Sequence, residues 1–418
     1  MHIAILGRQP ALGMAELERL YGPDAVRWFS DTAATISTAS FSIDSLGGAQ
    51  KAGRVVFDLP HADWRDVNAK ITHRYAHSWA QSEGKVTLGI SAYGFSIPPR
   101  DVQKIGLTLK SQLKKNGVNL RLIPNVDVAL STATSHHNKL GLSSNKVELL
   151  IVRSRSGRVI VAESIGSQNI TAYARRDQGR PKRDAFVGML PPKLAQIMIN
   201  LATPHHPSRP FFLSPVPVAN APTGSGRQEE GRSDDSHQYR VLDPFCGTGV
   251  VLQEAALMGC RVYGTDLSDK MIDYSRGNLD WLATIQHRPI DYTLHQGDAT
   301  TTTWQPPIDA VVCESYLGQP FSAPPSPSKL EQVRGNCNHI ISEFLQNIAR
   351  QITSGTPLCI AVPAWRDAHG SFHHLPLIRQ LEALGYSRIQ LRNVKDEELL
   401  YYREDQVVAR ELLVLVKS

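Results

Sequence analysis

The second half of the chain alternates between apolar strand-like segments and amphipathic helix-like segments, and this pattern limits its fold more than any other feature. Strands are predicted at YRVLDPF, RVYGTD, YTLHQGDA, IDAVVCES and PLCIAVPAW. Helices are predicted at 250–259, 268–282, 328–351 and 372–385. Two closing strands are predicted near 387–393 and 406–416. Strands that alternate with helices are typical of an α/β domain. Residues 239–418 are therefore predicted to form a doubly wound, mostly parallel sheet with a closing antiparallel hairpin.

The first half of the chain mixes strands and helices less regularly. Strands are predicted at MHIAILG, RVVFDLP and KVTLGISAYG, helices at MAELERLYG and VQKIGLTLKSQLKKNG, and a hairpin at VELLIVRS and RVIVAESIG. This is an α+β pattern. Between the halves, residues 204–238 are rich in Pro, Ser, Gly and charged residues. Such a segment buries too little apolar surface to offset its ordering entropy, so a flexible linker or insertion is predicted there.

Composition narrows the class of protein. The 45 Lys+Arg residues against 39 Asp+Glu give a net charge of +6, which is compatible with a polyanionic partner. The five cysteines form no CxxC pair, and the paired histidines lack partners at metal-binding spacing, so we expect a reduced protein without a metal site. We find no signal peptide and no run of about 18 apolar residues, the length that a membrane span needs. A cytoplasmic protein is expected.

The stretch VLDPFCGTG, residues 241–249, predicts a ligand site after the first strand of the second half. Gly247 and Gly249 remove the Cβ atoms that would keep the chain from a ligand, and the following helix N-terminus favours negative charge. A Walker loop would need a lysine that is missing here. A dinucleotide fingerprint would need a small residue where Leu252 stands.

Three successive predicted strands end in an acid, and this regularity identifies the ligand. Asp243 follows the first strand, Asp266 the second and Asp298 the third. Their carboxylates suit an ammonium, a ribose and an adenine amino group, which S-adenosylmethionine combines. The alternative is that they only cap helices and turns. The cofactor-binding residues predicted from this region are Asp243, Phe245, Cys246, Gly247, Thr248, Gly249, Asp266, Asp298 and Ala299.

DPFCGTG and its surroundings resemble the amino-methyltransferases that act on nucleic-acid bases, and most closely the THUMP-domain tRNA guanine-N2 methyltransferases. ILGRQPALGMAELERLYG, LGGAQKAGRVV, LTLKSQLKKNGVNLRLI, LSTATSHHNKLG and YARRDQGRPKRDAFVGMLPPKLAQIMINLA are similar to further segments of that family, in family order. The resemblance implies a Rossmann-like S-adenosylmethionine methyltransferase domain that modifies guanosine ten of tRNA. It implies five regions: an N-terminal α+β subdomain at 1–64, a THUMP-like RNA-binding domain at 65–170, a connecting segment and helix at 171–203, the linker at 204–238, and the methyltransferase domain at 239–418.

The resemblance also implies roles for two further segments. Pro192 and Lys193 begin a predicted helix that, in the family, borders the methionine end of the cofactor. Base amino-methyltransferases end their fourth strand with [DN]PP[YF], where the first side chain accepts from the target amine and the aromatic ring stacks on the base. This chain has CESYLG at 313–318, so the predicted catalytic residues are Glu314, Ser315 and Tyr316. The longer Glu314 side chain would hold the amine less rigidly than Asp or Asn.

Basic residues cluster in two segments that bracket the THUMP-like region. Residues 102–126 contain no acid, and ARRDQGRPKR holds a second cluster; either could be only a solvated face. We predict that they contact tRNA phosphates. The residues concerned are Lys110, Lys114, Lys115, Arg121, Arg175, Arg176, Arg180, Lys182 and Arg183.

Three other functions compete with this prediction. A DNA adenine or cytosine amino-methyltransferase would share DPFCGTG but would not need the THUMP-like region. An RNA-binding protein with an inactive methyltransferase fold would account for the departure at CESYLG. Cys313 could act as the nucleophile of carbon-5 pyrimidine methylation, although such enzymes usually carry Pro-Cys there. The sequence gives no indication for or against a small activating protein subunit.

Overall fold

The computed structural model describes residues 1–82, 84–184, 190–203 and 239–418. The predicted linker at 204–238 lies outside these residues. The chain divides into two compact units: Met1–Ala174 with Arg392–Val394, and Arg175–Leu391 with Lys395–Ser418. None of the described helices combines the length and the apolar character that crossing a membrane requires.

The described residues of the first unit form an eight-stranded mixed sheet in the order β2-β3-β1-β4-β8-β7-β5-β6. Its strands are β1 (His2–Leu6), β2 (Val26–Ser30), β3 (Ala33–Ile36), β4 (Ala49–Leu59), β5 (Lys85–Tyr93), β6 (Asn119–Leu122), β7 (Lys146–Arg153) and β8 (Val159–Ser167). The sequence predicted separate domains at 1–64 and 65–170, but one sheet runs through both. The reason is β4, which pairs with β1 on one side and β8 on the other.

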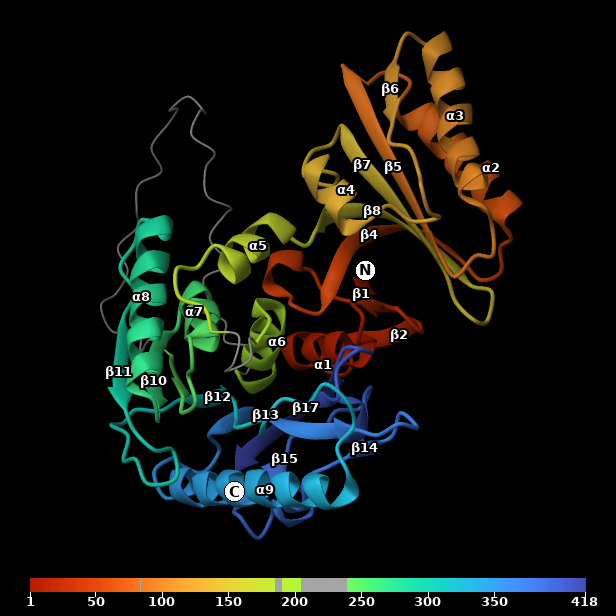
Figure 1. Ribbon diagram of the computed structural model, residues 1–418. Helices are drawn as coiled ribbons and strands as arrows, with labels where there is room; N and C mark the ends of the chain where they lie inside the picture. The colour runs from red at the N-terminus through yellow and green to blue at the C-terminus, as the bar shows by residue number, and fades with distance from the viewer. Residues whose placement is uncertain (83, 185–189, 204–238) are drawn as a thin grey trace. The chain divides into compact units, whose positions relative to one another are not determined.

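Helices α2 (Trp64–Ser78) and α3 (Pro99–Lys115) lie side by side on one face of the first sheet (Figure 1). Asp63 fixes the start of α2, since its carboxylate accepts from the backbone N–H groups of Arg65 and Asp66 at 2.8 and 2.9 Å. The apolar stripe of α3, including Ile105 and Leu109, is fully buried against the sheet. The remaining helices of this part are α1 (Pro10–Tyr21), α4 (Thr132–His137) and α5 (Ile170–Gln178), which ends in the second unit.

The second unit has the predicted doubly wound sheet, in the order β11-β10-β9-β12-β13-β17-β15. Its main strands are β9 (Arg240–Asp243), β10 (Arg261–Asp266), β11 (Tyr292–Gln296), β12 (Ala310–Glu314), β13 (Pro357–Arg366), β15 (Tyr386–Arg388) and β17 (Val408–Lys417). The pairs from β11 to β13 are parallel and β17 is antiparallel to both neighbours, which confirms the α/β fold with an antiparallel closing hairpin. The chain leaves β9 in one direction and returns to its other side at β12, so a ligand crevice is expected between these strand ends.

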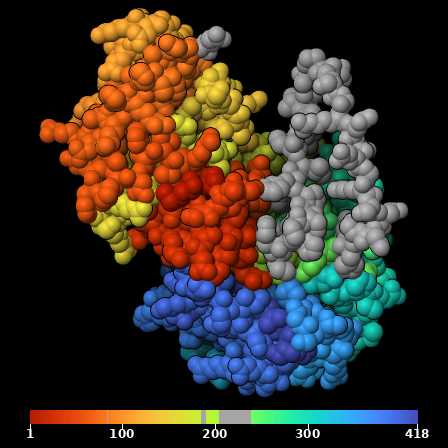
Figure 2. Space-filling view, turned by 180° about the vertical axis from the view of Figure 1, so that it is seen from behind, coloured from red at the N-terminus to blue at the C-terminus, as the bar shows by residue number. Residues whose placement is uncertain are grey.

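Among the described residues of this unit, four helices cover the sheet: α6 (Pro192–Ala202), α7 (Val250–Leu257), α8 (Asp269–Gln286) and α9 (Pro327–Ala349). The inner face of α9 packs Ile341, Phe344 and Ile348 into the core of the domain. The C-terminal part of the chain forms one continuous surface, coloured blue in the space-filling view (Figure 2). This core fixes the strand ends on which the candidate site is built.

The prediction of a helix at 372–385 is wrong. This segment instead forms the short strand β14 (Phe372–His373), which pairs with β13, and a 3-10 helix at Pro376–Gln380. Pro376 has no N–H to donate and disfavours a helical conformation in Leu375. Leu375 and Leu377 are still buried in the core, so the apolar pattern that indicated a helix reflects packing. The last short strand, β16 (Leu400–Tyr401), pairs with β17.

Candidate active site at the carboxyl ends of the parallel strands

The glycine-rich turn after β9 has the conformation that the sequence predicts. Gly247 and Gly249 have φ values of 51° and 82°, which side chains rarely adopt, and Gly249 is the N-cap of α7. A Cβ atom on Gly249 would lie 2.8 Å from the Ser275 hydroxyl. That hydroxyl donates to the carbonyl of Gly247 at 2.9 Å. The turn therefore packs directly against α8 at a position that leaves no space for a side chain on residue 249.

Asp243 lies beneath the turn. It is 2% exposed, and its Oδ1 accepts from the backbone N–H of Phe245 at 3.1 Å. Burial raises the pKa of Asp243 well above its ordinary value; the Phe245 N–H opposes this, and the carboxylates of Asp266 and Glu314 raise the pKa further. Asp243 thus brings the ends of β9, β10 and β12 into one electrostatic environment.

Asp266, at the end of β10, connects that strand to the turn. Its Oδ2 accepts from the N–H of Gly247 and its Oδ1 from the N–H of Ser268, both at 2.9 Å. Burial raises the pKa of Asp266, and these two backbone donors partly lower it. The capping role considered as an alternative is therefore real. Each carboxylate oxygen keeps a second lone pair that can accept from a ribose hydroxyl.

Asp298 and Ala299 follow β11. Asp298 is exposed, and its Oδ1 accepts from the N–H and hydroxyl of Thr300 at 2.9 and 2.7 Å, whereas Ala299 is buried. Sequence reasoning missed Leu267, directly after Asp266. Its side chain is 69% exposed, so an apolar surface stands beside the acid at the end of β10. An apolar residue next to a ribose-binding acid is suited to a flat heteroaromatic ring.

The segment before α6 is bound to the glycine-rich turn through Asn278 of α8, which sequence reasoning also missed. Asn278 is fully buried. Its Oδ1 accepts from Lys182 N at 2.9 Å, and its Nδ2 donates to Lys182 O at 2.9 Å and to Thr248 O at 2.8 Å. A buried Asn with both ends of its amide satisfied fixes two backbones relative to each other. Nothing in the local sequence marks it.

Pro192 and Lys193 open α6, as predicted. Helix α6 packs against α7, β12 and β13, so it borders the same strand ends. Burial lowers the pKa of Lys193. This placement is compatible with the predicted contact to the cofactor, which stays a prediction.

The predicted catalytic residues divide in their orientations. Glu314 ends β12 and forms an ion pair with Arg410 of β17. Ser315 is buried, and its hydroxyl donates to the carbonyl of Ala361 at 2.9 Å, so it serves the strand β13 rather than a substrate. Tyr316 is 41% exposed, which leaves its ring able to stack on a base. Sequence reasoning missed Arg410.

Cys313 does not fit the role of a nucleophile. Its side chain is fully buried in β12. Burial, with additions from Asp243, Cys359 and Glu314, raises its pKa well above the usual thiol value. The thiolate is the nucleophilic form, so this environment disfavours carbon-5 methylation through Cys313.

The two basic clusters differ in accessibility. Lys110, Lys114 and Lys115 on α3 are exposed, as is Arg121 on β6. Arg175, Lys182 and Arg183 are exposed in the second cluster.

Two arginines predicted to contact RNA are turned inward. Arg176 donates through Nε to Glu254 at 2.6 Å and through Nη2 at 3.1 Å, and is therefore committed to α7. Arg180 is 3% exposed, and its guanidinium nitrogens have no hydrogen-bond partner within the part of the chain that the structure describes. Burial lowers the pKa of Arg180. As they stand, neither side chain faces solvent where a phosphate could reach it.

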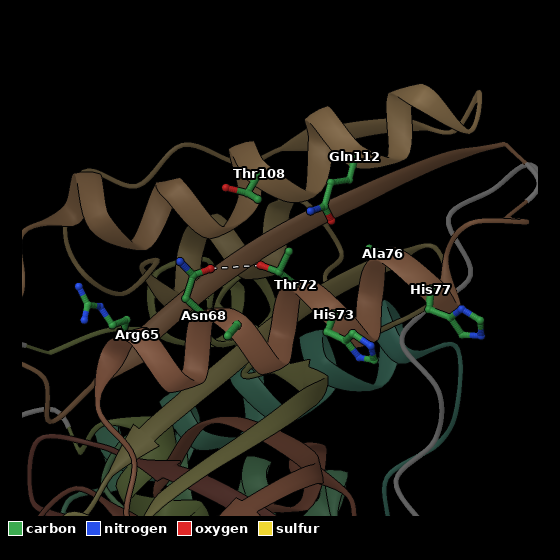
Figure 3. Close-up of a pocket in the computed structure, with 9 residues that line it drawn as sticks. Arg65, Asn68, Thr72, His73, Ala76, His77, Thr108 and Gln112 are labelled. Carbon is green, nitrogen blue, oxygen red and sulfur yellow. Dashed lines mark hydrogen bonds between the residues drawn. The ribbon is translucent and has the colours of Figure 1, made fainter.

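An open groove of about 750 Å³ lies between α2 and α3 of the first unit (Figure 3). His73 and His77 from α2 and Thr108 and Gln112 from α3 line it. Thr72 donates to Asn68 at 3.1 Å along its floor. The groove belongs to a different sheet from the glycine-rich turn, so it is not the cofactor site.

Comparison with known proteins now bears on this geometry. Residues 235–398 match the family model of a methyltransferase domain. This part of the chain has a Rossmann-like fold and is similar to methyltransferase domains.

Curated relatives carry the name that the motifs predict. A tRNA (guanine(10)-N2)-dimethyltransferase of Methanothermobacter thermautotrophicus is 28% identical over 222 residues, 52% of each protein. One of the same name from Pyrococcus abyssi is 43% identical over 83 residues, 20% of this chain and 21% of that protein. The match thus spans about half the length of the first relative and about a fifth of the second. The predicted resemblance to the tRNA guanine-N2 methyltransferases is confirmed, whereas the THUMP assignment stays a prediction.

Two solved structures share the fold along the whole chain. TrmN from Thermus thermophilus superposes with a TM-score of 0.53 at 17% identity, covering 100% of this chain and 99% of that one. A possible methylase from Clostridium difficile 630 gives a TM-score of 0.51 at 12% identity, covering 99% and 97%. At these identities the likeness concerns the fold alone.

Proposed function

We propose that this protein transfers a methyl group from S-adenosylmethionine to guanine N2 in tRNA. The observation that carries the proposal is the set of strand ends around the glycine-rich turn, where Asp243, Asp266 and Asp298 succeed one another on neighbouring parallel strands. The curated relatives supply the choice of substrate. Their matches cover only part of their length, so the substrate is part of the proposal.

The residues present fit S-adenosylmethionine. The turn bends through two positive-φ glycines at the strand end, Asp266 offers acceptors for ribose hydroxyls, and Leu267 offers an apolar surface to adenine. Pro192 and Lys193 of α6 would hold the methionine end. When bound, the cofactor supplies a methyl group on a sulfonium, which is electrophilic without any metal or cysteine.

The chain's own residues orient the target amine. Its lone pair is delocalised into the ring, so correct placement supplies much of the acceleration. Glu314 would accept a hydrogen bond from the amine N–H, which increases electron density on the nitrogen that receives the methyl group. Tyr316 stacks on the base. The methylated amine then releases its proton, for which no strong base is required.

The test offers the purified protein methyl-labelled S-adenosylmethionine with total tRNA or with DNA, followed by nucleoside analysis. We expect label in N2-methylated guanosine from tRNA. Label only in DNA would support the DNA amino-methyltransferase alternative. Binding of tRNA without transfer would support the inactive RNA-binding protein. Asp266→Ala serves as the cofactor-binding control, since it should abolish transfer while leaving tRNA binding intact.

A further inference from the structure

The catalytic stretch of this chain poses a physical problem that the structure answers. Glu314 stands where the base amino-methyltransferases that it resembles carry Asp or Asn. Its side chain has one more rotatable bond, and each free rotor lowers the fraction of time in which the carboxylate points at the amine. Fixing such a side chain costs conformational entropy. A second contact that already fixes the side chain in the free protein removes this cost from substrate binding.

Arg410 provides that contact from the neighbouring antiparallel strand. In the sheet register Glu314 lies opposite Ala361 of β13, and Arg410 lies opposite Pro363, two residues further along β13. The arginine side chain therefore reaches diagonally across β13 to the end of β12. The two side chains are only 9% and 15% exposed, for Arg410 and Glu314 respectively, so solvent screens their attraction weakly.

The contact uses one carboxylate oxygen and leaves the other. Nε of Arg410 donates to Oε1 of Glu314. Within the described part of the chain, no hydrogen bond reaches Oε2. Glu314 is partly exposed at the strand end, so Oε2 keeps its lone pairs for a ligand.

We propose that Arg410 is a positioning residue, which holds Glu314 through Oε1 so that Oε2 accepts from the target amine. The inference rests on the proposed function, and it names a part of that same site.

The charges around Glu314 show why such a partner is needed. Asp243 of β9 is close enough for the Glu314 carboxylate to raise the pKa of Asp243, and Cys313 lies next to Glu314 on its own strand. Strand β13 contributes Ala361 opposite Glu314, which carries no charge. Among the described residues, Arg410 is the cation that forms an ion pair with Glu314, and its charge is opposite to that of the two neighbouring carboxylates.

A purely structural role is the competing explanation, and the adjacent residue supplies a matched control. Glu411, next to Arg410 on β17, is also buried, and it pairs with Nδ1 of His374 at 2.6 Å. Successive residues of a strand point to opposite faces, so this second pair lies on the other side of the sheet. Glu411→Gln therefore breaks a buried pair on the same strand without touching Glu314.

The experiment compares the full-length wild type with Arg410→Met, Arg410→Lys and Glu411→Gln. For each protein we measure kcat and KM for tRNA, the affinity for S-adenosylmethionine, the melting temperature and the pH dependence of kcat. In Arg410→Met we expect kcat to fall about 100-fold, a typical effect of misplacing a reacting group, with cofactor affinity and KM within about threefold. Arg410→Lys should recover part of the lost rate, and Glu411→Gln should keep both the rate and its pH dependence.

A fourth comparison tests whether Arg410 acts through Glu314. On a Glu314→Ala background, Arg410→Met should lower kcat no further, since two residues that act as one unit are not additive. Additive losses, an unchanged rate in Arg410→Met, or equal losses in Arg410→Met and Glu411→Gln would each overturn the inference while leaving the proposed function standing. A wild type that methylates no nucleic acid would overturn both.

Discussion

Asp266 holds the glycine-rich turn, and we propose that the same carboxylate accepts from the ribose of the cofactor. Asp266→Ala removes both acceptors, and we expect S-adenosylmethionine to bind about 100-fold more weakly, which is the cost of two charge-assisted hydrogen bonds. Asp266→Asn keeps Oδ1 for the Ser268 N–H but cannot accept from Gly247 through its amide nitrogen, so an intermediate loss is expected. Isothermal calorimetry measures both affinities. The exposed Asp269→Asn, in the first turn of α8, is the control. Wild-type affinity in Asp266→Ala would mean that the cofactor binds elsewhere.

The buried carboxyl of Asp243 makes a pH-dependent contribution to stability. Its pKa is raised in the folded protein, so folding is not penalised below the unfolded value of 3.8, and stability is lost as pH rises through the raised folded pKa. Asp243→Asn keeps an oxygen acceptor for the Phe245 N–H and removes the charge. We therefore expect this variant to melt at a higher temperature than the wild type at pH 7.5, with the difference shrinking as pH falls toward 4. Melting curves across this range check the sign; a wild type that is the more stable protein at pH 7.5 would contradict it.

At the scale of elements, Asn278 of helix α8 joins the segment around Lys182 to the glycine-rich turn. Asn278→Ala would leave the part-buried N–H of Lys182 and the buried carbonyl of Thr248 without these partners, at a cost of about 1–3 kcal/mol. We expect a lower free energy of unfolding in denaturant and weaker cofactor binding, because the turn loses a fixed neighbour. Ser275→Ala, on the same helix, removes only the donor to Gly247 and should cost less. If both variants lose the same unfolding free energy and the same cofactor affinity, the hydrogen bonds of Asn278 contribute no more than the single bond of Ser275.

Elements whose signals are local could be predicted, and those that depend on strand order could not. Strand, glycine turn and acid follow one another in VLDPFCGTG and YGTD, so the site at β9 and β10 was evident from the residues. Glu314 and Arg410 are 96 positions apart, and they meet only because β17 enters the sheet beside β13. The same applies to Arg176, whose partner Glu254 is buried on α7. Charge in a sequence shows that a basic residue exists, not whether tertiary structure has already paired it.

At the scale of the whole molecule, the boundary at 64/65 shows a further limit of sequence reasoning. The apolar alternation of 49–59 predicts a strand but not its neighbours. Because β4 pairs on both edges, the first unit has one sheet instead of two domains. The predicted role of the first unit in tRNA binding therefore has to be tested on this unit as a whole.

The exposed lysines at the end of α3 offer that test. Lys114 and Lys115 lie in its last turn and are solvent-accessible. If they contact tRNA phosphates, the double variant Lys114→Ala, Lys115→Ala should bind tRNA about tenfold more weakly, and the slope of log affinity against log salt should become shallower by about one for each lost phosphate contact. Binding measured between low and moderate salt gives both quantities, and kcat at saturating tRNA should stay within about threefold, because the chemistry belongs to the other unit.

A matched variant separates phosphate contact from net charge. Arg155→Ala, Arg350→Ala also removes two exposed cations, one from each unit, and lies outside the predicted clusters. It lowers the net charge equally, so a general electrostatic attraction would weaken both variants alike. We expect its salt slope to stay at the wild-type value. Should both variants show the same shallower slope, α3 is a solvated face, and the tRNA must be held by other surfaces, of which the groove lined by His73 and His77 is the next to mutate.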